Sequence, residues 1–204
     1  MPKVVPEYKE KAKKRIMMHA AKLFSEKGYY KTKMIDIAES MGVSKGAIYQ
    51  YFDSKQDLLI STLEAHTNTR GEEVSKFLAS GGIAEIATEE FFDRMLSMRM
   101  GTLILSLDLL REAAVNSLVL KWAKESFESW VEGLSDTIEN FKKDGTVKNH
   151  IDSESVARGI LAIRDGLYSS ISVGSDISDV RRAWVTITRL LMMEILVDPN
   201  KQGL

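Results

Sequence analysis

Residues 28–59 read GYYKTKMIDIAESMGVSKGAIYQYFDSKQDLL, and this stretch decides the fold. Its apolar residues recur at helical rather than alternating spacing, which predicts short helices. Gly28 and Gly42 are suited to end two of them, and Ser44 is suited to cap the start of the next. The Gly-Val link between Met41 and Ser44 is just long enough for the sharp turn of a helix-turn-helix.

The helix predicted from Lys45 to Phe52 divides into two faces. One side is apolar and consists of Ile48, Tyr51 and Phe52. Another side carries Lys45, Tyr49 and Gln50, while the small residues Gly46 and Ala47 allow the backbone to approach a groove wall. A recognition helix needs a buried apolar side that packs on the domain and an exposed polar side that faces DNA.

The same stretch resembles the DNA-binding signature of the TetR family of transcriptional regulators. The resemblance covers roughly residues 10–65, and it is carried by Gly28–Ala38, Gly42–Phe52, Ser54-Lys55 and Leu58-Leu59. It implies an N-terminal helix-turn-helix DNA-binding domain in residues 1–55, followed by a helical effector-binding and dimerisation domain in residues 56–204.

The rest of the chain also predicts helices. All three prolines lie at the ends of the chain, at residues 2, 6 and 199, so long helices are permitted between them. Ser54 and Asp57 have capping-box spacing at the start of a fourth helix. Weak breaks delimit about five more helices, the longest from Ser117 to Lys143. We therefore expect an all-α fold of about nine helices, with a three-helix DNA-binding domain at its N-terminus.

The resemblance implies a division of labour among the residues that would contact DNA. Thr32, Lys33, Tyr49 and Lys55 would hold phosphates, because hydroxyl groups and lysine bind them readily. Ser44, Lys45, Gly46, Ala47 and Gln50 would lie closest to base edges, where lysine reads guanine and glutamine reads adenine. The chain departs from the family pattern at Gln50, where histidine is common.

Charge is distributed unevenly along the chain. Residues 1–55 contain 12 lysine and arginine residues against 6 acidic residues, a net charge of +6, whereas the remainder carries −7. A basic segment attached to an acidic body is typical of a protein whose first part meets a polyanion, although a solvated basic face has the same composition.

Several classes of protein are disfavoured. The chain has no cysteine, so it has no disulfides or thiolate sites, and no signal peptide or membrane-length apolar run is recognisable. These observations predict a cytoplasmic protein that does not contact membranes. The three histidines are scattered and no catalytic or phosphate-binding motif is present, so a helical enzyme is a remote alternative and no cofactor or metal is expected.

The C-terminal body is rich in methionine and aromatic side chains, which suit an apolar effector held between helices. Filling of the core is the alternative reading of the same residues. Asp108 and Arg164 stand out because a buried charge needs a partner. The predicted effector pocket comprises Phe92, Met95, Met98, Leu107, Asp108, Trp122, Phe127, Trp130, Arg164 and Tyr168.

The last two helices carry apolar stripes suited to bundle packing, and by family resemblance they form a homodimer interface. Its predicted residues are Val156, Ile160, Ile163, Leu167, Trp184, Ile187, Leu191 and Ile195. The alternative is that these stripes are buried within one subunit. A dimer would present two recognition helices to a palindromic operator, and an effector would release it as a repressor. A DNA-binding regulator without a small-molecule effector, controlled by a partner or acting as an activator, is the second reading.

Overall fold

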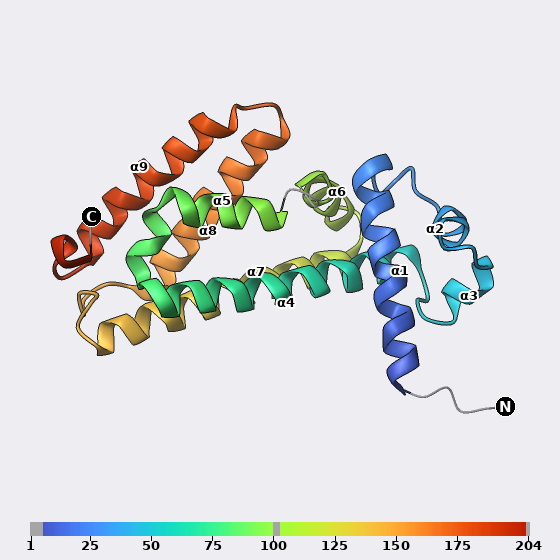
Figure 1. Cartoon of the computed structure of the whole chain (residues 1–204), viewed down its shortest axis with the longest axis horizontal. Helices are drawn as coiled ribbons and strands as arrows, with labels where there is room; N and C mark the ends of the chain where they lie inside the picture. The colour runs from blue at the N-terminus through green and yellow to red at the C-terminus, as the bar shows by residue number, and fades with distance from the viewer. Residues whose placement is uncertain (1–5, 100–102, 203–204) are drawn as a thin grey trace. The chain divides into compact units, whose positions relative to one another are not determined.

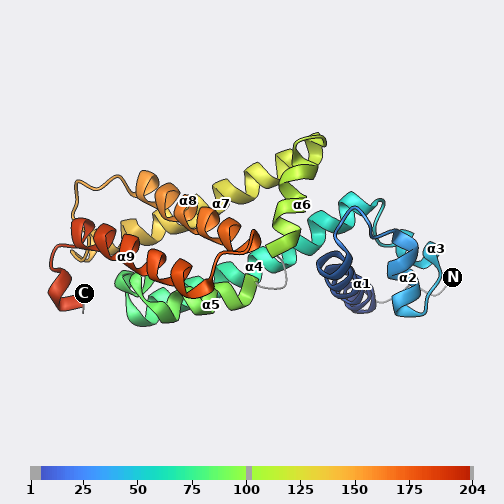
Figure 2. The same cartoon turned by 90° about the horizontal axis from the view of Figure 1, so that it is seen from above.

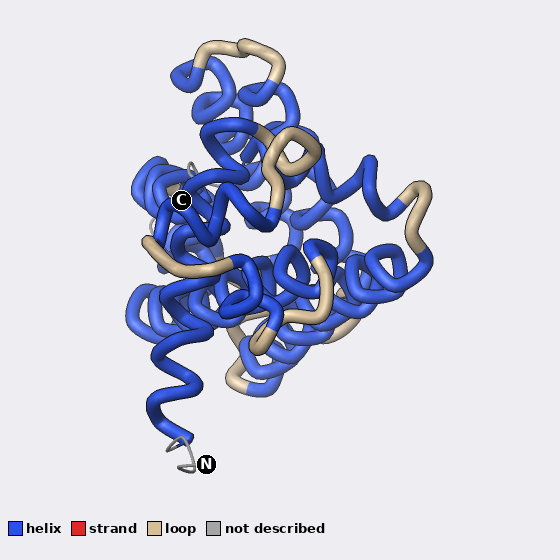
Figure 3. The backbone as a smooth tube through the Cα atoms, turned by 90° about the vertical axis from the view of Figure 1, so that its right-hand side faces the viewer, coloured by secondary structure: helices blue, strands red, loops and turns tan. Residues whose placement is uncertain are grey.

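The computed structural model describes residues 6–99 and 103–202, and within these two ranges the chain consists of helices joined by short loops (Figures 1 and 3). No strand occurs in these ranges, although an isolated bridge pairs Val147 with Leu196. The predicted all-α fold is therefore confirmed. No described helix is both long enough and apolar enough to cross a lipid bilayer.

The helices follow one another in a simple order along the chain. The α-helices are α1 (Pro6–Lys27), α2 (Met34–Met41), α3 (Lys45–Tyr49), α4 (Lys55–Gly81), α5 (Glu89–Arg99), α6 (Leu103–Ala113), α7 (Ser117–Lys143), α8 (Ser153–Ser172) and α9 (Ile177–Ile195). Two described 3-10 helices, η1 (Ile83–Ala87) and η3 (Pro199–Gln202), complete the set. The bounds of α7 are those predicted from the sequence.

Local chemistry explains where several helices begin and end. Gly28 follows α1 with a φ of +81°, a left-handed conformation that glycine adopts without steric cost. The start of α4 is capped as predicted, because the Ser54 hydroxyl accepts the amide of Asp57 at 3.0 Å. Helices α8 and α9 begin at Ser153 and Ile177, because the carboxylates of Asp152 and Asp176 cap them.

The chain forms two compact units. The N-terminal unit comprises residues 1–68 and 101–123, and the C-terminal unit comprises residues 69–100 and 124–204. The N-terminal unit thus contains α1, α2 and α3 together with α6 and the starts of α4 and α7. The sequence predicts a boundary between residues 55 and 56, which separates a DNA-binding domain from an effector-binding and dimerisation domain. That functional boundary stays a prediction.

The core of the N-terminal unit is built from the apolar faces of its helices. Phe24, Ile37, Ile48, Leu58 and Leu105 are each completely buried there. These residues come from α1, α2, α3, α4 and α6 respectively, so all five helices contribute to one core. Because α6 supplies Leu105, this core includes a helix that the sequence assigned to the effector domain.

In the C-terminal unit, α9 packs against α5, η1 and α8. Figure 2 shows α8 and α9 side by side in this unit. Trp184 of α9 is 2% exposed, and its ring lies 6.1 Å from that of Phe91 and 6.3 Å from that of Phe92. Its indole nitrogen donates to the carbonyl oxygen of Ile86 at 2.8 Å. A buried tryptophan with a satisfied nitrogen is the centre of this core.

Candidate nucleic-acid interface

The turn between α2 and α3 is sharp, and hydrogen bonds hold it on both sides. Gly42 ends α2 with a φ of +68°, and the following amide, of Val43, donates to the carbonyl oxygen of Ala38 at 3.0 Å. Ser44 then caps α3, because its hydroxyl accepts the amide of Ala47 at 3.2 Å. Both caps predicted from the sequence are confirmed, and together they fix the direction in which α3 leaves the turn.

Helix α3 has a buried side and an exposed side. Ile48 is completely buried and Phe52, just beyond the helix, is 2% exposed, so these residues seat α3 in the core. On the opposite side Lys45, Tyr49 and Gln50 are exposed. The ammonium of Lys45 lies 5.4 Å from the centre of the Tyr49 ring, which holds a cation beside a hydroxyl on the exposed surface.

The predicted length of this helix was wrong at its C-terminal end. The helix stops at Tyr49 rather than at Phe52, and the amide of Tyr51 turns back to the carbonyl oxygen of Ile48 at 3.0 Å. The next residues belong to the start of α4, since the amide of Asp53 donates to the Asp57 carboxylate at 2.9 Å. The capping of α4 therefore takes the chain out of the helix early.

Most of the predicted contact residues lie on the exposed surface of the N-terminal unit. Lys33, at the start of α2, is exposed, as are Ser44 and Gly46, and Ala47 is half-buried. With Lys45, Tyr49 and Gln50 they make up a set of polar or small side chains on the helix-turn-helix. We call this set, Lys33, Ser44, Lys45, Gly46, Ala47, Tyr49 and Gln50, the reading surface.

Thr32 and Lys55 have a different position from the one their predicted phosphate contacts require. Thr32 is 0% exposed, and its hydroxyl donates to the carbonyl oxygen of Gly28 at 2.9 Å. The ammonium of Lys55 donates to the carbonyl oxygens of Tyr29 at 3.0 Å and Thr32 at 3.2 Å. Their contacts hold the loop between α1 and α2, residues 28–33, rather than leaving the two side chains free for DNA.

Lys55 is held in this loop by more than its hydrogen bonds. Its ammonium lies 4.1 Å from the centre of the Tyr29 ring, a cation–π contact. Burial lowers the pKa of Lys55, while the carboxylates of Glu112 and Asp108 oppose that shift. Burial also raises the pKa of the Tyr29 hydroxyl well above its ordinary value. The partly buried ammonium of Lys55 therefore holds the loop through both the Tyr29 ring and the backbone carbonyl oxygens.

Two acidic residues of α6 reach the same loop, and sequence reasoning missed their role. The Asp108 carboxylate accepts the backbone amide of Tyr29 at 2.7 Å, and the Tyr30 hydroxyl donates to Glu112 at 2.8 Å. Glu112 is only 5% exposed, and the guanidinium of Arg111 lies 4.2 Å from the Tyr30 ring. We call this set of contacts the α6 latch. The signal available in the sequence was that Asp108 interrupts an apolar run and needs a partner.

The predicted effector residues are divided between the two compact units. Leu107, Asp108 and Trp122 belong to the N-terminal unit, where Trp122 donates to Glu64 at 3.0 Å. The other seven belong to the C-terminal unit. Within that unit some fill the core and some lie near its surface: Phe92, Met95 and Tyr168 are buried, whereas Met98, Phe127, Trp130 and Arg164 are half-buried.

The predicted dimer residues are also divided by burial. Ile160, Trp184 and Ile195 are buried within the C-terminal unit, so they belong to the core of one subunit. The half-buried members are Val156, Ile163, Leu167 and Leu191. Ile187 is exposed, and the prediction omitted the exposed apolar residues Leu190 and Met193 of α9 and Val197 just after it. An apolar surface exists on α9, but it is not the stripe that contains Trp184.

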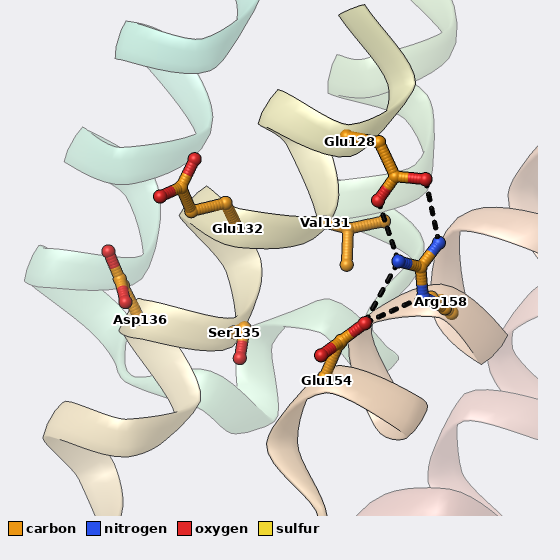
Figure 4. A pocket seen from close by; sticks show the side chains of 7 residues that line it. All are labelled: Glu128, Val131, Glu132, Ser135, Asp136, Glu154 and Arg158. Atoms are coloured by element: carbon orange, nitrogen blue, oxygen red, sulfur yellow. Dashed lines mark hydrogen bonds and ion pairs between the residues drawn. The ribbon is translucent and has the colours of Figure 1, made fainter. Parts of the chain in front are cut away.

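An open groove of about 310 Å³ lies on α7 and α8 of the C-terminal unit (Figure 4). Carboxylates dominate its lining, and the one arginine, Arg158, is bound by Glu128 at 2.6 Å and by Glu154 at 2.9 Å. None of the ten predicted effector residues lines this groove. Within the described residues, no group of three or more histidine or acidic side chains could hold a metal ion.

The geometry of α2, the bonded turn and the exposed face of α3 defines a helix-turn-helix, the motif that presents its second helix to the major groove of DNA. Residues 16–62 match the family model described as bacterial regulatory proteins, tetR family. Residues 16–62 therefore carry the helix-turn-helix segment of this regulator family, and the similarity to solved TetR-family structures extends the shared fold to the rest of the chain.

Three relatives illustrate the extent of the similarity. The regulator HbdR of Aromatoleum sp. (strain CIB) is 42% identical over 71 residues, which span 35% of this chain and 31% of HbdR, so the match covers under a third of that protein. The activator FasR of Mycolicibacterium smegmatis is 28% identical over 154 residues, covering 73% of this chain and 67% of FasR. A TetR-family regulator from Pectobacterium atrosepticum has a similar structure, with a TM-score of 0.71 at 24% identity, covering 96% of this chain and 99% of that one.

Proposed function

We propose that the chain is a ligand-responsive repressor that binds a palindromic operator as a homodimer and is released by a small, apolar effector. The observation that carries this proposal is the reading surface, where Lys45, Tyr49 and Gln50 are exposed while Ile48 seats the helix. Its residues offer a cation, a hydroxyl and an amide, which are the groups that bind phosphates and base edges. The location consistent with this function is the cytoplasm, where the DNA lies.

The test of DNA binding is fluorescence anisotropy with duplexes selected from genomic fragments by the purified protein. Binding should weaken steeply with salt, because each neutralised phosphate changes the slope of log K against log salt by about −0.9. Lys45→Ala should weaken binding, whereas Lys124→Ala, an exposed lysine of the C-terminal unit, should not. Failure to bind any duplex at low salt would sink the proposal.

The roles within the reading surface can be separated by sequence preference. Tyr49→Phe removes a phosphate-binding hydroxyl, so it should weaken binding to all duplexes alike. Gln50→Ala should instead relax the preference at one base pair by about 1–3 kcal/mol, because glutamine reads a base edge. Uniform losses from both substitutions, across a panel of single-base variants of the operator, would contradict this division.

The homodimer is proposed to form through α8 and α9, within residues 56–204. Ile187, Leu190 and Met193 are exposed apolar residues of α9, and Leu190 is 60% exposed. A two-fold axis there would make the interface isologous and would present two copies of α3 about one DNA turn, roughly 34 Å, apart. Leu190→Glu should give folded monomers with weak operator binding, as measured by sedimentation equilibrium. Lys143→Glu is the matched control, and dimers that persist in Leu190→Glu would contradict the assignment.

The effector response is proposed as a coupling between two sites. If the effector weakens operator binding by some factor, the operator must weaken effector binding by the same factor. Calorimetric titration of effector with and without operator measures both sides of this relation. Equal affinities in the two titrations would show that the ligand does not control DNA binding.

Activation of transcription is a second candidate function, and the similarity to FasR over 73% of the chain favours it. Repression and activation differ in what the bound dimer does to polymerase, not in how it binds the operator. Run-off transcription from the natural promoter, with and without the protein, separates them. A rise in transcript on adding the protein would replace repressor by activator and leave the DNA-binding proposal intact.

A further inference from the structure

A cluster of two arginines and one aspartate lies in the C-terminal unit, on α5 and α8. Arg164 donates through its Nε to Oδ1 of Asp165 at 3.0 Å, and a terminal nitrogen of Arg99 approaches the same oxygen at 3.3 Å. Two guanidinium groups therefore converge on one carboxylate oxygen. The cluster therefore concentrates two guanidinium groups on α5 and α8, whereas the groove on α7 and α8 is lined mainly by carboxylates.

The cluster is partly withdrawn from water and walled by aromatic rings. The Arg164 side chain is 17% exposed and that of Arg99 is 19% exposed. Arg164 lies 5.4 Å from the centre of the Trp130 ring, and Arg99 lies 5.2 Å from that of Tyr168. Burial, followed by the charge of Arg164, lowers the pKa of Arg99, which is the effect expected where positive charge is concentrated.

Arg164 is the member of the cluster with donors to spare. Its described contacts are the Nε hydrogen bond to Asp165 and the cation–π contact with Trp130, and the hydrogen bond does not use the two terminal nitrogens. These nitrogens form the edge of the guanidinium that binds a carboxylate in a bidentate manner. A half-buried donor edge beside an aromatic ring is suited to a ligand that joins an anion to an apolar group.

We propose that Arg164, with Arg99 beside it, binds the anionic head of an amphipathic monocarboxylate whose apolar part lies against Trp130. The two terminal nitrogens of the Arg164 guanidinium match the two oxygens of a carboxylate. This inference rests on the proposed function only in taking the ligand to be the effector. It replaces a purely apolar effector by one with a charged end.

The test uses the purified full chain and four ten-carbon probes that differ only in their head groups: decanoate, decyl phosphate, decanol and decyltrimethylammonium. A fifth probe, 4-phenylbutanoate, varies the apolar part. Calorimetry should show binding of the two carboxylates, with decanol and the cation at least about tenfold weaker. Decanol binding as tightly as decanoate would overturn the anionic site. Tighter binding of decyl phosphate would overturn the assignment to a carboxylate, as would absence of binding by both carboxylates.

Variants identify the site. Arg164→Gln should weaken decanoate by about tenfold or more while leaving decanol unchanged, and Arg164→Lys, which keeps the charge but loses the fork, should lie between. Arg181→Gln removes an arginine paired with Asp93 at 2.8 Å in the same unit, and it should bind decanoate normally. Unchanged affinity in Arg164→Gln would refute the proposal. If Arg164→Gln does not fold, as judged by its circular dichroism, Arg164→Lys decides.

Failure of this inference differs from failure of the proposed function. Anisotropy with operator DNA, in the absence of any probe, should give the same affinity for the parent chain and for Arg164→Gln. Loss of DNA binding by the parent chain would sink the proposed function while leaving the carboxylate affinities untouched. Decanoate that binds through Arg164 but does not release operator would keep the site and remove its role as the effector site.

Discussion

The α6 latch should contribute measurably to the stability of the N-terminal unit. Asp108 accepts the backbone amide of Tyr29 at 2.7 Å, and Tyr29 is 1% exposed, so water cannot replace the carboxylate easily. A hydrogen bond to a charged group contributes about 1.5–3 kcal/mol, and an unsatisfied buried amide costs a similar amount. Asp108→Ala should therefore lower the free energy of unfolding by about 2 kcal/mol. At roughly 2–4 °C per kcal/mol for a chain of this size, Tm should fall by about 4–8 °C.

The assay is urea unfolding followed by circular dichroism, with hydrogen exchange at the Tyr29 amide as a local readout. Asp108→Asn keeps an acceptor but loses its charge, so it should cost about half as much as Asp108→Ala. Asp136→Ala is the control, because Asp136 is exposed and has no hydrogen bond or ion pair within the described part of the chain. A loss under about 0.5 kcal/mol for Asp108→Ala, with unchanged protection of the Tyr29 amide, would refute this reasoning.

Three further outcomes follow from single contacts. Gly42→Ala should cost about 1 kcal/mol in urea unfolding, because its φ of +68° is strained for any residue with a Cβ, and a loss near zero would contradict a left-handed cap. Trp184→Phe removes the donor to Ile86 and should cost about 1–3 kcal/mol, whereas a neutral result would mean that this nitrogen is not buried against its carbonyl. The pKa values of Asp152 and Asp176 lie below their ordinary range, chiefly because the hydroxyls of Ser155 and Ser178 donate hydrogen bonds to their carboxylates. These caps therefore stabilise the fold above about pH 4. That contribution is lost as the pH falls through the pKa of the folded state. The double Asp→Asn variant should show a smaller drop in Tm between about pH 6 and pH 3 than the parent chain, and an equal drop would contradict this assignment.

Helix ends were predictable because their causes are local. Gly28, Gly42 and Ser44 act within three or four residues of themselves, so their caps follow from the sequence alone. The bounds of α7 were predictable for the same reason. The end of α3 was not, because it depends on Asp53 being drawn into the start of α4. The sequence indicates where α3 could continue and where α4 could be capped, but it does not show which of the two determines the end of α3.

Helix α9 shows what periodicity leaves open. A helical spacing of apolar residues indicates a buried face, but it does not say whether the buried partner is the same chain or a second copy. Trp184 and Met192 face the core of the C-terminal unit, while Leu190 and Met193 are exposed. Both sets repeat at helical spacing. Only the contacts with Ile86 and Phe91, far away in the sequence, distinguish the inner stripe from the outer one.

Long-range polar contacts were the hardest to predict. Asp108 was recognised as a charge in an apolar run, yet its partner is an amide 79 residues away. The same limit applies to Lys55, whose acceptors are carbonyl oxygens 26 and 23 residues away. A family pattern indicates that such residues matter for DNA binding without saying whether they touch DNA.

The contacts of Thr32, Lys55 and Asp108 point to one explanation for that pattern. Each binds a backbone group of residues 28–33, the loop that leads into α2. Since α2 packs against α3, fixing this loop fixes the helix on which α3 is seated. A side chain can therefore be required for operator binding while acting one layer behind the reading surface. The distinction has a measurable form, because substitutions behind the surface lower the stability of the fold, whereas Lys45 and Gln50 can be changed without loss of stability.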